Sequence, residues 1–446
     1  MCSDKLQNMD FQHVTFHFRE YEFNREKGIL FLRYSLDDEI HFEEKLIFNV
    51  SLIDWNTVNL DLLDRTFFHL HLIGGVSYYK TYLPKKIEIH SGKLSEKQAE
   101  FWNTLYTKGL GEFFYRNDID FLGLIHFPIS ISEPIAPISL SLPEKTLLPM
   151  GGGKDSIVSA ELLLSRNEDF RLFSLEDHGP IAETSKIIGK PRILVKRELS
   201  PKLFEMNKNG AYNGHVPITA YISFLLLTTS VLYGYKNSVL SLERSANYGN
   251  LTFHELEINH QYSKSKEFEE NFMEYVRNFL SPDLRIYSLL RPYYEIKIAK
   301  MFAEIVQKKP EYLKVFTSCN RNFSIQKKES SKLWCGECPK CAFTFLILAP
   351  FLPKKIMIET FGKNLFADEK LLPTFRELLG ISDHKPFECV GIPEESKLAF
   401  VLIQEKGEYD NDIAMKMFQK EVQISENEKK KLKQEILSIH ELSPNS

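Results

Sequence analysis

The sequence has no excess of basic residues, no internal repeat and no long tract of low complexity. It contains 56 lysine and arginine residues against 60 aspartate and glutamate residues, for a formal net charge of -4. Proteins that cover a large nucleic-acid surface usually carry a clear basic excess. The balance therefore argues against a nucleic-acid partner, and nothing in the composition indicates an oligomeric state.

Cysteine is also scarce, and it is unevenly placed. Only six cysteines occur in 446 residues, and four of them lie between Cys319 and Cys341. Such clustering favours a metal site in a reducing compartment over a disulfide framework. We therefore expect a cytoplasmic protein.

One uncharged stretch is long enough to raise the question of a membrane. Residues 216–235 carry no charged side chain, and about 20 apolar residues are enough to span a bilayer. This stretch, however, contains several serines and threonines and lies inside an alternating strand and helix pattern. The pattern favours a helix buried against a sheet over a membrane span.

The most distinctive stretch is a run of three glycines between an apolar segment and a helix-forming segment. Residues 146–150 predict a buried strand, and residues 157–164 have the spacing of a helix. A strand, a glycine turn and a helix N-terminus present free backbone N–H groups and the positive end of the helix dipole to an anion. The predicted phosphate site consists of Gly151, Gly152, Gly153, Lys154, Asp155 and Ser156, with Asp155 as a candidate magnesium ligand.

This run differs from the P-loop of kinases and ATPases at two positions. That motif requires a glycine where Leu148 stands and a serine or threonine after the lysine, where Asp155 stands. The run instead resembles the PP-loop of ATP pyrophosphatases, usually Ser-Gly-Gly-x-Asp-Ser, with Gly151 in place of the first serine. The resemblance implies an adenine nucleotide alpha-hydrolase-like fold, ATP cleavage between the α- and β-phosphates, and adenylation of a substrate oxygen. An ordinary glycine turn is the alternative.

Strand-like and helix-like segments alternate over the middle of the chain. This alternation predicts an α/β fold with a doubly wound, mostly parallel sheet, in which ligands bind beyond the carboxyl ends of the strands. The expected strands are 145–150, 170–175, 192–195 and 238–242, and the expected helices are 156–166, 181–188 and 217–233. We expect three parts: an N-terminal α+β domain at 1–140 that opens with a hairpin and could bind substrate, a catalytic domain at 141–350 and a helical region at 351–446.

The cysteine cluster has the spacing of a metal site. Four thiolates satisfy tetrahedral zinc and leave no open position, so the role of such a zinc ion would be structural. An iron–sulfur cluster is the alternative metal centre, and free thiols in a core are the non-metal alternative. The predicted ligands are Cys319, Cys335, Cys338 and Cys341.

Several polar segments carry a resemblance to a known family. They are residues 75–80, 213–217, 243–247, 259–266, 318–321 and 385–391. Together they resemble the MurL family of ATP-dependent UDP-N-acetyl-muramoyl-L-alanyl-L-glutamate epimerases, over about residues 21–391. The most specific part is the pairing of Gly-Gly-Gly-Lys-Asp-Ser at 151–156 with Trp-Cys-Gly-Glu-Cys-Pro-Lys-Cys at 334–341.

The resemblance implies a step in peptidoglycan precursor synthesis. The terminal L-glutamate of UDP-MurNAc-L-Ala-L-Glu would be inverted to D-glutamate, with ATP and Mg²⁺ as cofactors and AMP and diphosphate as products. Adenylation removes the charge of the carboxylate next to the Cα–H bond, so that a side-chain base can take the proton. Two bases are expected, one for each face.

Roles can be assigned to single residues on this basis. Candidates for the bases are His215, Glu243, His260 and Lys266, and candidates for substrate binding are Arg244, Asn247 and Lys264. Each histidine has an equally good structural interpretation. Cys389 is interpreted as a small buried apolar residue, although a thiolate can also carry a proton.

Two other functions compete with the epimerase. The first is a PP-loop enzyme that adenylates a heterocycle or an RNA base, because the cysteine spacing also resembles the zinc site of PP-loop deazaguanine-nitrile synthases. The second is a non-catalytic nucleotide-binding module, which would keep the glycines but would not need the polar segments.

Overall fold

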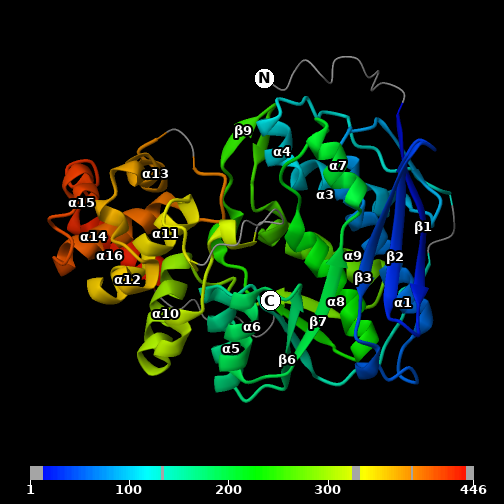
Figure 1. The fold of residues 1–446 in the computed structure, drawn as a ribbon, viewed down its shortest axis with the longest axis horizontal. Coiled ribbons are helices and arrows are strands. Elements are labelled where there is room, and N and C mark those ends of the chain that lie inside the picture. Colours follow the sequence, from blue (N-terminus) through cyan, green and yellow to red (C-terminus); the bar gives the residue numbers. More distant parts are fainter. Residues whose placement is uncertain (1–13, 132–134, 324–331, 383–384, 438–446) are drawn as a thin grey trace.

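A single large sheet crosses the molecule in the computed structural model, which describes residues 14–131, 135–323, 332–382 and 385–437 (Figure 1). Within these residues, nine strands form the sheet. In order across it they are β11 (Arg285–Ser288), β8 (Asn237–Leu240), β5 (Thr146–Pro149), β6 (Phe170–Leu175), β7 (Arg192–Glu198), β3 (Ile40–Ile47), β2 (Ile29–Leu36), β1 (Thr15–Asn24) and β4 (Lys86–Ile89).

The half of the sheet from β11 to β7 is parallel throughout, as the alternating pattern predicts. All four expected strands are present, with ends that differ by up to three residues from the expected ones. The strand β11 was not expected from the sequence. Its four residues alternate between exposed and buried, with Arg285 and Tyr287 facing outward, so it contains no apolar run.

The other half of the sheet is mostly antiparallel. The strands β1 and β2 form the predicted hairpin, β2 pairs with β3, and β3 pairs with β7 through Leu46 and Arg197. The N-terminal strands therefore extend the same sheet as the glycine run. The division of the chain at residues 140 and 350 stays a prediction.

The sheet separates two hydrophobic cores. Because side chains alternate along a strand, Leu147 and Leu148 of β5 point to opposite faces, and they belong to different cores. The first core is covered by α1 (Leu60–Gly74), α3 (Glu96–Gly109), α8 (Ile218–Tyr233) and α9 (Lys266–Phe279), and the second by α5 (Lys154–Ser165), α6 (Gly179–Ile188) and α10 (Glu295–Lys308). Shorter elements on the first side are α2 (Val76–Tyr79), α4 (Gly111–Arg116), α7 (Pro201–Lys208) and the ribbon of β9 (Leu251–Phe253) and β10 (Leu256–Ile258).

The uncharged stretch forms the predicted buried helix, α8. Its hydroxyl groups are accommodated because they donate to carbonyl oxygens one turn earlier, as Ser223 does to Thr219 at 2.9 Å and Thr229 to Leu225 at 2.7 Å. Across the part of the chain that the structure describes, no helix combines the length and the apolar character that a membrane span requires.

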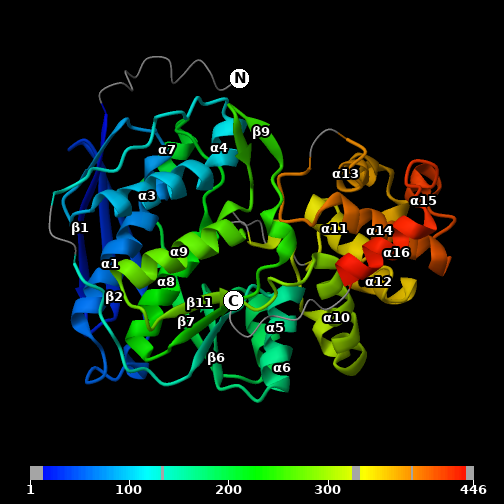
Figure 2. The ribbon, with the colours of Figure 1, turned by 180° about the vertical axis from the view of Figure 1, so that it is seen from behind.

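The C-terminal part is helical, as predicted, and lies on the side of the molecule away from β1, β2 and β3 (Figures 1 and 2). It completes the second core. Its helices are α11 (Pro339–Leu348), α12 (Lys354–Phe361), α13 (Leu372–Leu378), α14 (Pro393–Lys406), α15 (Ile413–Phe418) and α16 (Glu426–Leu437).

Candidate functional site

The glycine run forms the corner between β5 and α5. Gly152 has a φ of +72°, which only glycine adopts without strain, and its carbonyl accepts from the backbone N–H of Thr317 at 2.9 Å. A Cβ atom on Gly153 would lie 2.7 Å from the Ser318 hydroxyl, whereas one on Gly151 would meet nothing within 4 Å. The corner is thus braced by the segment that leads into the cysteine cluster, and it is open at Gly151.

The first turn of α5 begins at Lys154, two residues earlier than expected, and its lysine points inward. The Lys154 side chain is buried, and its ammonium donates to the carboxylates of Asp155 and Glu295. Ser156 donates to the Gly153 carbonyl at 3.1 Å. Burial alone would lower the pKa of Lys154, but the two carboxylates raise it, so its charge is retained and compensated inside the protein.

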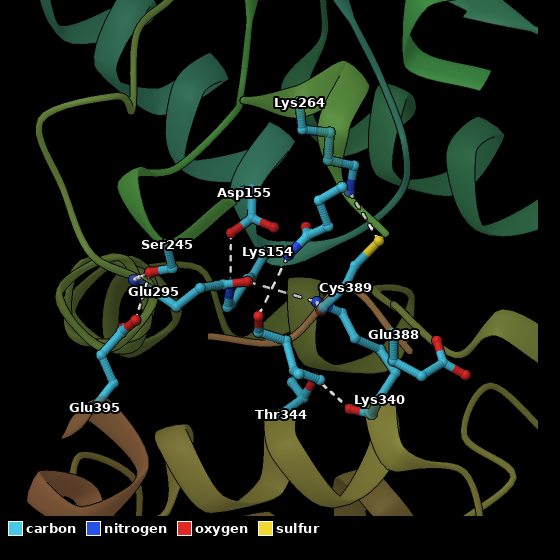
Figure 3. A network of polar contacts seen from close by, with 12 residues as sticks. Lys154, Asp155, Ser245, Lys264, Glu295, Lys340, Thr344, Glu388, Cys389 and Glu395 are labelled. Atoms are coloured by element: carbon cyan, nitrogen blue, oxygen red, sulfur yellow. Dashed lines mark hydrogen bonds and ion pairs between the residues drawn. The ribbon is translucent and has the colours of Figure 1, made fainter. Parts of the chain in front are cut away.

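A second lysine connects this turn to the cysteine segment. Lys340 stands between Cys338 and Cys341, and its ammonium lies 3.5 Å from a Glu295 carboxylate oxygen. It also donates to the backbone carbonyl of Cys389 (Figure 3). Glu295, at the start of α10, therefore joins the glycine corner to residues 385–391.

The four predicted cysteine ligands come together. Their sulfur atoms all lie within 4.8 Å of one another, at 3.4 Å for Cys338 and Cys341, 3.6 Å for Cys335 and Cys341, and 4.0 Å for Cys319 and Cys338. Tetrahedral zinc, with Zn–S bonds of about 2.3 Å, holds its sulfurs about 3.8 Å apart. The cluster could therefore bind a single metal ion such as zinc.

A second polar cluster forms where α4, the segment before α9 and residues 385–391 meet. The Cys389 sulfur accepts from the Lys264 ammonium at 3.1 Å and lies 3.6 Å from Nε2 of His260. The other ring nitrogen of His260 bonds to the Glu112 carboxylate, which also lies 3.4 Å from Nδ1 of His215. The interpretation of Cys389 as an apolar residue is wrong, because its sulfur contacts a cation.

Charge and burial set the protonation of this cluster. Burial opposes ionisation of Cys389, but Lys264 and His260 hold the pKa of its thiol well below the usual range. Burial likewise opposes the charged form of His260, yet Cys389 and Glu112 raise the pKa of His260 to about 9. Burial and the neighbouring His260 lower the pKa of His215 to about 3. These shifts favour a thiolate beside an imidazolium at neutral pH, with His215 neutral.

Glu243 is a predicted base on which charged groups of both networks act. It follows β8 and is buried, and burial together with the charge of Glu295 raises the pKa of Glu243 against the opposing effect of Lys264. Asp155 also acts on Glu243. The glycine corner and the Cys389 cluster thus share one electrostatic environment.

Three predicted residues lie at the surface instead. Arg244 is exposed, with its guanidinium 5.1 Å from the centre of the Tyr294 ring. Asn247 is also exposed and accepts from the backbone N–H of Lys266 at 2.6 Å. Lys266 is exposed at the start of α9, 3.3 Å from Glu270. These residues are accessible to a large substrate but are not part of the buried networks.

No pattern in the sequence singled out Glu112, Glu295 or Lys340. Each makes contacts with residues far away along the chain, so its role has no local pattern. Two signals were available. Glu112 is a charged residue between the apolar residues Leu110 and Phe113, and Lys340 is a charged residue between two predicted metal ligands, Cys338 and Cys341.

Comparison with known proteins gives matches along most of the chain. The model of the MurL N-terminal domain matches residues 8–289, and that of the MurL C-terminal domain matches residues 315–433. A protein of Xanthomonas oryzae pv. oryzae (strain MAFF 311018), named UDP-N-acetyl-alpha-D-muramoyl-L-alanyl-L-glutamate epimerase, is 38% identical over 412 residues, 92% of this chain and 90% of that protein. Proteins of the same name from Micromonospora sp. (strain ATCC 39149 / NRRL 15099 / SCC 1413) and Salinispora tropica (strain ATCC BAA-916 / DSM 44818 / JCM 13857 / NBRC 105044 / CNB-440) are 36% and 37% identical, over 92% and 91% of this chain and 90% and 87% of theirs.

Proposed function

The chain belongs to the MurL family, and from that premise we propose that it inverts the terminal L-glutamate of UDP-MurNAc-L-Ala-L-Glu to D-glutamate. The reaction would consume ATP, release AMP and diphosphate, and supply a cytoplasmic step of peptidoglycan synthesis. The observation that carries the mechanism is the connection, through Glu295 and Lys340, of a glycine corner to a buried cluster of titratable groups.

Adenylation is the first step that we propose. The backbone N–H groups at the start of α5 and the Ser156 hydroxyl would hold the polyphosphate, since the positive end of the helix dipole lies there. Transfer of AMP to the α-carboxylate of the glutamate removes its negative charge, which lowers the barrier to loss of the neighbouring proton. A carbanion next to a free carboxylate would carry two adjacent charges.

Two metal ions fit residues of this chain. Asp155 offers a carboxylate with a side chain 23% exposed, and carboxylate oxygens are ligands that Mg²⁺ prefers; the ion would neutralise charge on the phosphates. The four-cysteine cluster suits structural zinc, since a multinuclear iron–sulfur cluster would hold the sulfurs farther apart.

Proton transfer at Cα is the second step. Glu243 and neutral His215 are the candidates for taking the proton that the buried contacts support, and His260, which is protonated, is a candidate for returning one. Lys266 remains a candidate, although its exposed side chain is paired with Glu270. Arg244, Asn247 and Lys264 remain candidates for substrate binding, and exposure suits the first two for contacts with the nucleotide sugar.

The test is chiral analysis of the glutamate after incubation with ATP, Mg²⁺ and the UDP-linked dipeptide. We expect D-glutamate, solvent deuterium at Cα in D₂O, and diphosphate release that requires the L-Glu substrate. Asp155→Asn should abolish diphosphate release. Diphosphate release that depends on tRNA or a heterocycle would instead support a different PP-loop enzyme. If no substrate caused diphosphate release, the interpretation as a non-catalytic nucleotide-binding module would be favoured.

A further inference from the structure

Cys389 is held by three segments that are distant in sequence. His260 contacts its sulfur, and the backbone N–H of His260 donates to the Asn250 side chain at 2.9 Å. The Asn250 amide donates in turn to the carbonyl of Pro386 at 2.8 Å, three residues before the cysteine. Phe387 stacks on Tyr115 of α4, with ring centres 5.2 Å apart. These contacts fix the sulfur relative to the His260 ring and to α4, which carries Glu112.

The surroundings of this sulfur are those of a reactive thiolate. An ammonium lies at 3.1 Å and an imidazole at 3.6 Å, and the far side of the imidazole is bonded to the Glu112 carboxylate. Cations next to a thiol favour the thiolate, which is the form that accepts protons. A cysteine that only filled space would need neither of these polar neighbours.

The sulfur is also linked through a chain of contacts to the predicted phosphate site, near which the reacting carbon must lie. In an acyl-adenylate, only the carbonyl carbon and one oxygen separate Cα from the phosphorus, so the base must lie close to the phosphate site. The Cys389 carbonyl is bonded to Lys340, which pairs with Glu295 of the Lys154 network (Figure 3). Lys264, which touches the sulfur, is also under the electrostatic influence of Asp155.

We propose that Cys389 is a catalytic residue of the epimerase, with its thiolate taking the Cα proton on one face, and that His260 and Lys264 position and stabilise it. This inference rests on the function proposed above. In the forward direction the S–H bond forms, the C–H bond breaks and its electron pair delocalises onto the carbonyl oxygen of the adenylated glutamate. A protonated group on the opposite face then supplies a proton to Cα, and water hydrolyses the acyl-adenylate to the D-glutamyl product and AMP. Proton exchange with solvent resets both groups, so no oxidant or reductant is needed.

The first experiment separates adenylation from proton transfer. Cys389→Ala and Cys389→Ser are compared with wild type for substrate-dependent exchange of labelled diphosphate into ATP and for D-glutamate formation. Loss of a general base typically costs about 10²- to 10⁴-fold. We therefore expect D-glutamate formation to fall by about that factor while exchange stays within about threefold of wild type. Cys2→Ser, the same change at the other cysteine outside the four-cysteine cluster, is the control.

Each other outcome has a definite meaning. Absence of substrate-dependent exchange in the wild type refutes the proposed function itself. D-Glutamate formation by both Cys389 variants within threefold of wild type overturns the inference and leaves the function standing. Parallel loss of exchange and turnover in a folded serine variant would assign Cys389 to substrate binding. A glutamyl adduct on Cys389, detected by mass spectrometry after acid quench, would make it a nucleophile instead.

A second experiment tests the positioning residues. The rate at which iodoacetamide labels the Cys389 peptide is measured against pH by mass spectrometry. His260→Asn and Lys264→Met should each move the midpoint of labelling to higher pH, because each removes a cation from the thiolate. Lys202→Met, at a surface lysine paired with Glu205, should not move it. A midpoint near 8.5, the ordinary cysteine value, in the wild type would overturn the assignment of a thiolate.

Discussion

Glu295 compensates two buried lysines, so replacing it should be costly. Lys154 is 1% exposed and Lys340 is 7% exposed, and the Glu295 carboxylate lies against both ammonium groups. Glu295→Gln keeps the volume but removes the charge, which leaves Asp155 as the carboxylate bonded to Lys154. Removal of one partner of a buried ion pair typically costs about 3–5 kcal/mol, because a buried charge loses its compensation. We expect a loss of that size in the free energy of unfolding.

The assay is equilibrium unfolding in urea, followed by circular dichroism and by the fluorescence of the tryptophans, of which Trp334 lies in the second core with Glu295's helix. Glu267→Gln is the matched control, because Glu267 pairs with Lys108 at 2.6 Å but is 49% exposed, and such pairs are worth about 0–1 kcal/mol. Lys154→Met combined with Glu295→Gln should recover part of the loss. A loss no larger than that of the control would show that Asp155 alone compensates Lys154, and the reasoning about Glu295 would be wrong.

Three further results are expected. Gly152→Ala should lower the free energy of unfolding by about 1–2 kcal/mol in the same urea assay, because its φ is +72°, whereas Gly151→Ala has free space and should not. Cys338→Ser should reduce the zinc content, measured by elemental analysis, from about one ion per chain to about none, because tetrahedral zinc needs four ligands; unchanged metal content would exclude this cluster. Burial raises the pKa of Glu395 to about 7, so its contribution to stability is full below the ordinary carboxyl pKa near 4.5 and is lost as pH rises through 7. Glu395→Gln should flatten the stability between pH 4.5 and 7, and an unchanged slope would count against a raised pKa.

Local patterns made much of the fold and part of the site predictable. The strands β5 and β6 are short, mostly apolar and largely buried, and the helix α5 lies between them, so four of the five parallel strands followed from the sequence and β11 did not. The glycine corner and the cysteine cluster were also predictable, because the residues of each lie close together in the sequence.

The contacts that build the Cys389 cluster could not be read from the sequence, because they join distant segments. Glu112 and His260 are 148 residues apart, and Lys264 and Cys389 are 125 residues apart. No periodicity or spacing links such positions, and only the closure of the fold around the sheet brings them together. A thiol also has no sequence signature that separates a thiolate from a buried apolar group, since the difference lies in its neighbours.

Lys154 and Lys264 already pair with groups of the protein, so they should contribute little to the attraction of the ATP phosphates. Lys154 is bonded to Glu295, and Lys264 to the Cys389 sulfur. Attraction for the ATP phosphates would then come chiefly from the backbone N–H groups and the dipole of α5. Lys264→Met should therefore leave the KM for ATP within about threefold of wild type in the diphosphate-exchange assay, while D-glutamate formation falls by about tenfold or more because the thiolate loses its closest cation. A rise in the KM for ATP with D-glutamate formation otherwise unchanged would instead make Lys264 a phosphate ligand, and the separation between nucleotide binding and proton transfer would not hold.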